Sequence, residues 1–310
     1  MTVKDHDNTT TATATATPSS DTATATASDT VTSSRAVDES NMKWRYQHTI
    51  DPAAGDVRAC QMISPNQLAV CVRHCVKVYD VTGESSRLAY TVATQEWRMR
   101  GIHGVAVSES SPDSMLVICD GLPYVYQCPR HESTVENKKF EIQSNDKNPW
   151  CIVANASVAV IAMSRRSSFI VWNLPDFTHQ SHVQIGLDPS DMTITSDYLV
   201  VASGKVMIVK ALSDVTQDVA RIESPDGGEF SSIAFRNNGR EIYAACNQVE
   251  TCCVYKYTWD GVGKPEYVNS GSIFEYDIMR VYYRVLSVTS GRLLAVGQYM
   301  DGIVLIYKLH

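Results

Sequence analysis

A strand-rich pattern returns roughly every 40–50 residues from about residue 57 onward, and this repeat constrains the fold more than any other feature of the chain. The clearest copy within each unit is a strand rich in β-branched and aromatic residues. It recurs at residues 75–81, 169–174, 206–212, 254–259 and 303–309. A repeat of this length predicts sheet units of similar size that bury their faces against one another in turn.

Each repeat contains enough short strands and turns to form a four-stranded sheet. In the first repeat the predicted strands begin near residue 57 and continue at 67–72, 75–81 and 88–92. Four further repeats follow this order, and a sixth has three strands. We therefore predict an all-β fold, a six-bladed β-propeller of four-stranded antiparallel blades over residues 44–310.

The sixth repeat has strands at 285–288, 293–296 and 303–309, and its fourth strand is missing. A further strand, residues 44–50, precedes the first repeat and has the alternation of a strand with one buried face. Pairing of 44–50 with 303–309 would close the ring by the N-terminal strand and remove exposed sheet edges.

Residues 1–43 differ in composition from the rest of the chain. They have few large apolar side chains and contain alternating Thr-Ala runs at 11–17 and 22–27. Such a segment cannot bury enough surface to offset the entropy lost on ordering, so we predict a disordered Thr/Ala/Ser-rich leader. A tether or a modified Ser/Thr stalk is the alternative interpretation.

The composition is that of an ordinary soluble globular protein, with 44% apolar and 20% charged residues. The start of the chain lacks a basic segment followed by an apolar one, and no stretch offers the roughly 18 apolar residues of a membrane-spanning helix. We expect a cytoplasmic monomer without a membrane partner.

Charge and cysteine usage argue against further classes of function. The formal net charge is −7, which argues against a nucleic-acid partner, since nucleic-acid affinity rests on concentrated positive charge. The nine cysteines include no Cys-x-x-Cys pair, so neither a disulfide framework nor a zinc site is expected. No cofactor and no metal is predicted.

Two strands resemble the Trp-Asp strand of WD-repeat blades. They are Val-Lys-Val-Tyr-Asp-Val at 76–81 and Ile-Val-Trp-Asn-Leu at 170–174. The segments 102–107 and 284–296 are similar to NHL-repeat blades, which form the C-terminal domain of many tripartite-motif proteins. Both resemblances imply a propeller that binds proteins. The Gly-His dipeptide of WD repeats is absent from the sequence, and with no cysteine before Cys60 a RING or B-box is not expected.

The loops that enter the innermost strands of a propeller, and those between its second and third strands, gather on one face around the central channel. One such loop contains Trp97, Arg98, Arg100 and His103. These residue types dominate interface hot spots because they combine large contact area with directed hydrogen bonds. We predict that they bind a partner; the alternative for Trp97 is that it fills the gap between the first two blades.

Other loops on the same face complete the predicted partner-binding rim. Their candidate residues are aromatic or basic: Arg73, His74, Arg165, Arg166, Tyr276, Arg280 and Tyr282. A solvated turn is the alternative interpretation of Arg165 and Arg166.

These observations predict a non-catalytic protein-interaction scaffold that binds a peptide or protein on the loop face. The chain has no Gly-x-Ser-x-Gly elbow and no phosphate-binding Gly-x-x-x-x-Gly-Lys loop, and no catalytic residue is assigned. One alternative is a lactonase-like, divalent-metal-dependent hydrolase using the axial channel, for which Asp191, Glu229 and His103 are the acidic or imidazole groups near the innermost strands. Another is RNA binding through a basic rim.

Overall fold

The computed structural model describes most of the chain beyond residue 43. The described residues are 44–52, 56–82, 85–130, 137–144, 148–164, 167–178, 180–236, 239–247, 252–261, 263–272, 283–288, 293–298 and 302–309. Their strands all belong to one compact unit, Ser40–His310. The predicted leader over residues 1–43 lies outside the described residues and stays a prediction.

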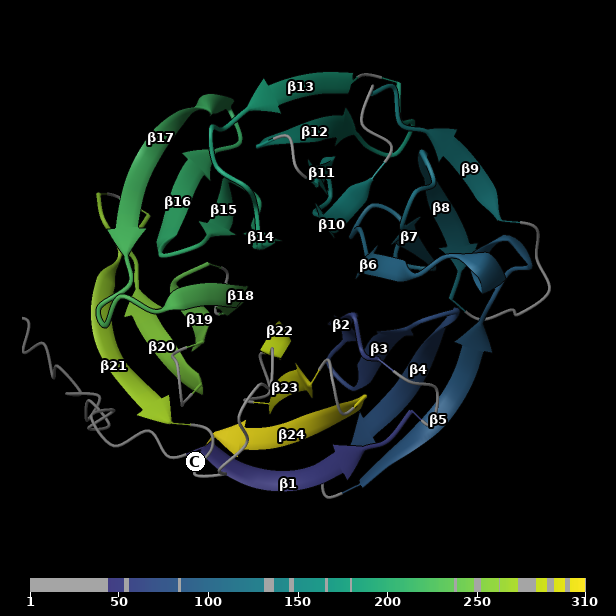
Figure 1. Ribbon diagram of the computed structural model, residues 1–310, viewed down its shortest axis with the longest axis horizontal. Coiled ribbons are helices and arrows are strands. Elements are labelled where there is room, and N and C mark those ends of the chain that lie inside the picture. The colour runs from purple at the N-terminus through teal and green to yellow at the C-terminus, as the bar shows by residue number, and fades with distance from the viewer. Residues whose placement is uncertain are drawn as a thin grey trace, which may run out of the picture. The chain divides into compact units, whose positions relative to one another are not determined.

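Six four-stranded antiparallel sheets are arranged as blades around a central axis, which confirms the predicted fold (Figure 1). Blade one contains β2 (Ala59–Ser64), β3 (Gln67–Val72), β4 (Cys75–Thr82) and β5 (Ser85–Val92). Blade two contains β6 (Ile102–Ala106), β7 (Ser114–Cys119), β8 (Tyr124–Pro129) and β9 (Lys138–Glu141). Blade three contains β10 (Pro149–Ala154), β11 (Val158–Met163), β12 (Ser168–Asn173) and β13 (Gln180–Gln184).

The second half of the ring repeats this order from the innermost to the outermost strand. Blade four contains β14 (Asp191–Ile194), β15 (Tyr198–Ser203), β16 (Val206–Ala211) and β17 (Asp214–Glu223). Blade five contains β18 (Glu229–Arg236), β19 (Glu241–Asn247), β20 (Cys252–Thr258) and β21 (Glu266–Ser272). Blade six contains β22 (Tyr283–Val288), β23 (Leu293–Gln298), β24 (Ile303–Leu309) and β1 (Trp44–Ile50).

The N-terminal strand closes the ring, as predicted. β1 is the outermost strand of blade six and pairs antiparallel with β24, from Trp44 opposite Leu309 to Ile50 opposite Val304. Segments from opposite ends of the described chain therefore share one ladder of backbone hydrogen bonds (Figure 1). The edge that β24 would otherwise expose is covered.

The core lies between neighbouring blades. The second strands β3, β7, β11 and β15 share one burial pattern, in which only the first residue is partly exposed. Both faces of these strands are covered by neighbouring sheets, so their sequences are continuous apolar runs rather than alternating ones. Blades one and two, for example, share a cluster that includes Ala69, Val78, Val105 and Val117.

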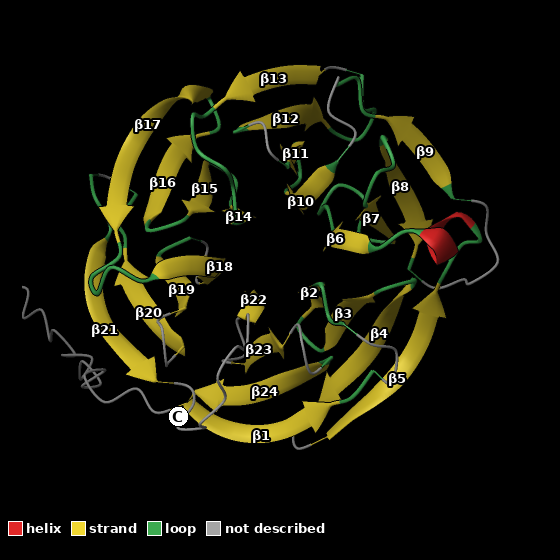
Figure 2. Cartoon of the chain, viewed as in Figure 1, coloured by secondary structure: helices red, strands yellow, loops and turns green. Residues whose placement is uncertain are grey.

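A short 3-10 helix, η2 (Glu96–Met99), connects blade one to blade two (Figure 2). It lies between β5 and β6, directly before the innermost strand of blade two. No helix in the described part of the chain is long and apolar enough to cross a membrane.

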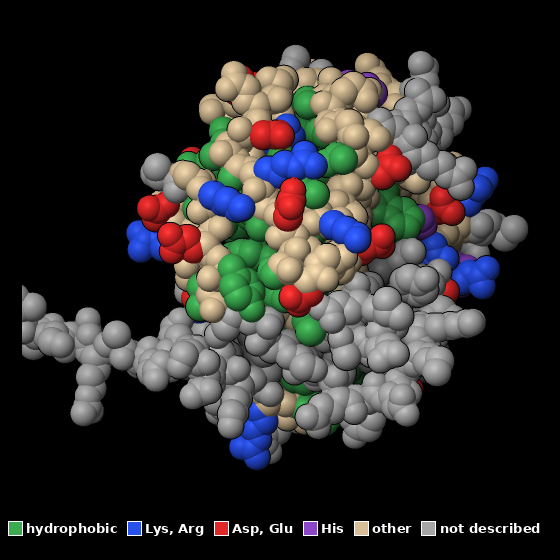
Figure 3. Space-filling view, turned by 60° about the vertical axis from the view of Figure 1, so that its left-hand side comes forward, with side chains coloured by type: hydrophobic (Ala, Val, Ile, Leu, Met, Phe, Trp, Pro, Cys, Tyr) green, Lys and Arg blue, Asp and Glu red, His purple; other side chains and the backbone are tan. Residues whose placement is uncertain are grey.

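The outer strand β17 is largely exposed, and its outward side chains include Asp214, Asp218, Arg221 and Glu223. Acidic and basic side chains are interspersed on this side of the ring (Figure 3). Lys210 from the neighbouring strand β16 donates to Asp218 at 2.7 Å, so part of this charge is paired. This outer surface shows no dominant sign of charge that would select a partner.

Candidate functional site

The beginnings of the innermost strands lie at the same end of the molecule as the turns between the second and third strands. Antiparallel pairing causes this arrangement: in blade one, Ala59 near the start of β2 lies opposite Cys71, and the β3–β4 turn follows at Val72 and Cys75. We call this end of the molecule the loop face. It is the face on which the partner-binding residues are predicted.

A chain of polar and aromatic contacts connects five blades on the loop face. Arg58 Nη1 lies 2.8 Å from His103 Nε2, and the His103 ring meets the Trp150 ring edge to face at a centroid distance of 5.0 Å. Trp150 Nε1 donates to the carbonyl of Ser190 at 3.2 Å, and Ser190 Oγ donates to the carbonyl of Phe230 at 2.8 Å. These contacts join neighbouring blades near the start of each innermost strand. We call them the mouth ring.

Asp191 connects three innermost strands directly behind the mouth ring. Its carboxylate accepts hydrogen bonds from Cys151 Sγ of β10 at 3.3 Å, from the Met192 amide at 2.8 Å, and from Ser232 Oγ and the Ile233 amide of β18 at 2.5 and 2.9 Å. Burial raises the pKa of Asp191 to about 6, and the hydrogen bonds oppose this shift only in part. The hydrogen bonds of this carboxylate thus connect β10, β14 and β18.

We expect Asp191 to make stability depend on pH in mildly acidic solution. Its pKa in the folded protein, about 6, is above the ordinary value of 3.8, so the folded state binds the proton more tightly than the unfolded state. The contribution of this group to stability is therefore complete below about pH 4 and is lost as the pH rises through about 6.

The measurement is urea unfolding of the wild type and Asp191→Asn between pH 4 and 7. The difference in unfolding free energy between the wild type and the variant should decrease by up to roughly 3 kcal/mol as the pH rises across this interval. A difference in unfolding free energy that does not change with pH would contradict the assignment.

Basic residues gather where blades one and two meet on the loop face. The β3–β4 turn carries Arg73 and His74, both exposed, and the Arg73 carbonyl accepts a hydrogen bond from the Ile102 amide at 3.3 Å. His74 Nδ1 lies 3.4 Å from the carbonyl of Trp97. These contacts bring the turn against the segment that carries the exposed Arg100. We call Arg58, Arg73, His74, Arg100 and His103 the basic corner.

Two glycines leave space for the guanidinium groups of the basic corner. A Cβ atom on Gly101 would lie 2.4 Å from Arg58 Nη1, and one on Gly121 would lie 2.9 Å from Arg100 Nη1. Both arginine heads therefore pack against bare backbone. Asn148, from the loop before β10, is also near Gly121.

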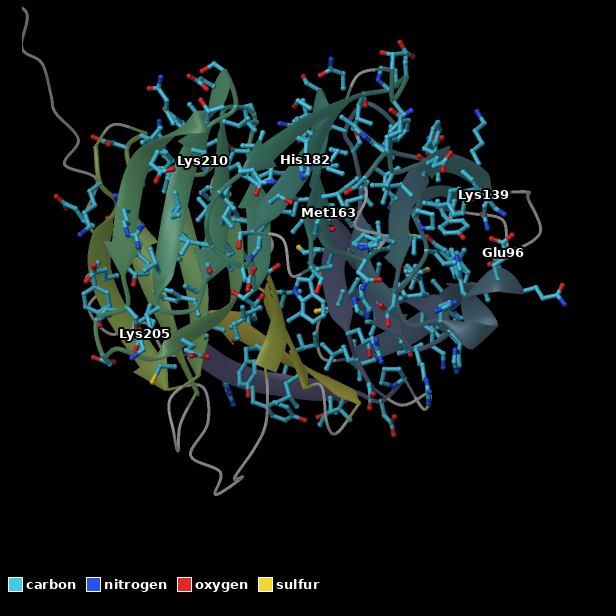
Figure 4. The ribbon with its side chains drawn as sticks, turned by 45° about the horizontal axis from the view of Figure 1, so that its top comes forward. Glu96, Lys139, Met163, His182, Lys205 and Lys210 are labelled. Carbon is cyan, nitrogen blue, oxygen red and sulfur yellow. The ribbon has the colours of Figure 1, made fainter. Side chains whose placement is uncertain are left out.

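The η2 helix is anchored by its first two residues. Trp97 is fully buried and meets Tyr126 edge to face at a centroid distance of 5.6 Å. Glu96 accepts a hydrogen bond from the Tyr126 hydroxyl at 2.9 Å and pairs with Lys139 at the outer side of blade two (Figure 4). Hydrogen bonds from Lys139 and Tyr126 lower the pKa of Glu96. The contacts of Glu96 and Trp97 therefore fix the position of the loop that carries Arg100.

A crystal structure of the WD40 beta propeller domain of Doa1 matches this arrangement with a TM-score of 0.57, over 86% of this chain and 97% of that one. The fold of this chain is a β-propeller, as in that domain. The two sequences are 11% identical, so the likeness concerns the fold alone. No protein-family model and no curated protein matches the chain.

In this propeller the predicted site residues have different positions. Arg73, His74, Arg100 and His103 come together in the basic corner, whereas the Trp97 side chain lies in the interior between blades one and two. Trp97 fills the gap between the first two blades, which is the alternative interpretation given for it from the sequence. Arg98 belongs to η2. Five candidates lie outside the described residues: Arg165, Arg166, Tyr276, Arg280 and Tyr282.

Arg58, Asn148 and Trp150 also lie at this site and are not among the residues predicted from the sequence. Arg58 and Asn148 precede the innermost strands β2 and β10, and Trp150 is the second residue of β10. A position at the start of an innermost strand is the sequence signal that could identify them, because His103 at the start of β6 is predicted on the same ground. Their residue types alone do not separate them from ordinary surface residues.

The groups considered for a metal site in this propeller are dispersed. Asp191 is engaged by four hydrogen bonds, Glu229 is exposed at the start of β18, and His103 contacts Arg58. Within the described ranges, no three His, Cys, Asp or Glu side chains form a group that could hold a metal ion. Burial raises the pKa of the Cys151 thiol, which donates to Asp191 as a neutral group.

Proposed function

We propose that this propeller is a non-catalytic protein-interaction platform that binds a peptide or protein partner at the basic corner. One observation carries the proposal. Arg73 and Arg100 are exposed, and among the described residues neither guanidinium has a hydrogen-bond or ion-pair partner. By contrast, the exposed Lys139 on blade two is paired with the carboxylate of Glu96.

The scaffold beneath the corner supports this function. Trp97 anchors the loop that carries Arg100, and backbone hydrogen bonds join the Arg73 turn to the same segment. A partner would therefore meet loops whose backbone loses little conformational freedom on binding, which favours affinity. Arginine is also among the residue types enriched at interface hot spots.

The test is a pull-down from nuclease-treated lysate with the full chain as bait, compared with Arg73→Glu/Arg100→Glu. The matched control is Lys205→Glu/Lys138→Glu, which makes the same change of charge at exposed lysines of blades four and two. Trp97 is left intact because its side chain lies in the core.

We expect specific partners to be retained by the wild type and the control and reduced at least about 10-fold by the arginine variant. Equal sets of captured proteins for both variants would place the interaction elsewhere on the molecule. Thermal unfolding of both variants checks that the fold is intact.

A further inference from the structure

We infer that the basic corner binds an acidic peptide segment, whose oxyanion lies between the guanidinium groups of Arg58 and Arg100. The inference rests on the proposed function and specifies the chemistry of the partner. The oxyanion is a carboxylate of Asp or Glu or a phosphate on a modified Ser or Thr.

Arg58 is the first reason for an anionic ligand. Its Nη1 approaches His103, its Nε is buried, and that Nε has no hydrogen-bond partner. A partly buried cation with an unpaired donor is unfavourable, because desolvation is not compensated by a counter-charge. A bound oxyanion at the head of Arg58 would supply the missing counter-charge.

The contact between Arg58 and His103 indicates which nitrogen of the imidazole carries the proton. Arginine can only donate hydrogen bonds, so His103 Nε2 accepts and the ring is neutral with its proton on Nδ1. The ring also packs edge to face on Trp150, which holds its orientation. The neutral His103 therefore orients Arg58 without neutralising its charge.

Arg100 is the second cationic group and is more exposed than Arg58. Its head lies against Gly121, and the head of Arg58 lies against Gly101, the residue that follows Arg100. The two guanidinium groups thus lie against two backbone segments, which are joined by the hydrogen bond from the Asp120 amide to the Gly101 carbonyl. Planar guanidinium groups match the geometry of carboxylate and phosphate with paired N–H donors, which a lysine cannot do.

The carboxylate of Asp120 does not compensate this charge. Asp120 is tied to the same backbone through its amide, which donates to the Gly101 carbonyl at 2.8 Å, and its side chain is exposed. Within the described part of the chain, Asp120 makes no ion pair with Arg58 or Arg100. Arg73 and His74 add positive character on the adjoining turn. An acidic segment therefore fits the corner better than an apolar or basic one.

Fluorescence anisotropy with labelled peptides on the full chain tests the inference. The probes are a tetraglutamate peptide, a phosphoserine peptide of the same length, a tetralysine peptide and an oligouridine. The variants are Arg100→Gln, Arg100→Lys and the matched control Lys205→Gln, all at exposed positions. Gly101→Ala is a fourth variant, because a Cβ there would collide with the Arg58 head.

We expect at least one acidic peptide to bind and the tetralysine peptide not to bind. Added salt should weaken the acidic complex, because charge screening acts on exposed ion pairs. Arg100→Gln should weaken binding about 10-fold or more, Arg100→Lys should restore only part of it, and Lys205→Gln should leave it unchanged. Preference for glutamate or phosphoserine identifies the source of the oxyanion.

The inference is overturned if neither acidic peptide binds at millimolar concentration, or if Arg100→Gln and Lys205→Gln behave alike. Tighter binding of oligouridine, lost in the same variants, would also overturn it and assign the corner to nucleic acid. If lysate partners still depend on Arg73 and Arg100 while no acidic probe binds, the interaction platform stands and the acidic chemistry alone is wrong.

Discussion

Replacement of Trp97 by alanine is expected to lower the free energy of unfolding by about 3–5 kcal/mol. The indole is fully buried between blades one and two and packs on Tyr126. Its removal leaves a cavity that the neighbouring strands can fill only in part, because the strands of both blades are held in hydrogen-bonded sheets. Urea denaturation followed by circular dichroism measures the loss.

Two controls separate the cavity from other effects of this change. Trp150→Ala removes the same side chain from a partly exposed position and should cost clearly less. Trp97→Phe should also cost less than Trp97→Ala, because the buried Trp97 Nε1 has no hydrogen-bond partner to lose. If Trp97→Ala is no more destabilising than Trp150→Ala, the core assignment of Trp97 is wrong.

The second large effect is expected for Glu241→Ala in blade five, again about 3–5 kcal/mol of unfolding free energy. Glu241 Oε1 lies 2.9 Å from Lys256 Nζ, and Oε2 lies 3.3 Å from Arg236 Nη1. The side chains of Lys256 and Arg236 are only 3% and 8% exposed. Removal of the carboxylate would take away the counter-charge that Glu241 supplies to two buried cations.

Glu96→Ala is the matched control for Glu241→Ala, because it removes a carboxylate from an ion pair whose side chains are 42% and 49% exposed. Solvent screens such a pair, so the expected cost is at most about 1 kcal/mol. Replacement of Glu241, Lys256 and Arg236 together by methionine should recover most of the lost stability, since the three buried charges of this network are removed together. Equal costs for Glu241→Ala and Glu96→Ala would contradict the description of the network as buried.

The blade number and the closing strand could be predicted because both depend on local patterns. The run at β15 (Tyr198–Ser203) is apolar because it is covered on both faces, and equivalent runs recur once per blade. β1 could be recognised because a ring with one incomplete blade requires another strand. Neither inference needed a contact between particular side chains.

The candidate site was predicted in part. Arg73 and His74 occupy a β3–β4 turn, and Arg100 and His103 occupy the entry to β6, so antiparallel geometry alone brings them to one face. Arg58 was missed because it becomes important only through His103, 45 residues away in sequence. Such pairs depend on how one blade packs against the next.

The sequence by itself determined the repeat, the number of blades, the closure by β1 and the face that carries the basic loops, because strand patterning and antiparallel pairing are local properties. Only the tertiary structure decided that Trp97 turns inward, that Asp191 connects three blades, and that Glu241 lies among buried cations. The physical reason is that burial and charge pairing depend on side chains contributed by neighbouring strands and blades. A residue's type indicates what it can bind, and its packed surroundings decide which partner it has.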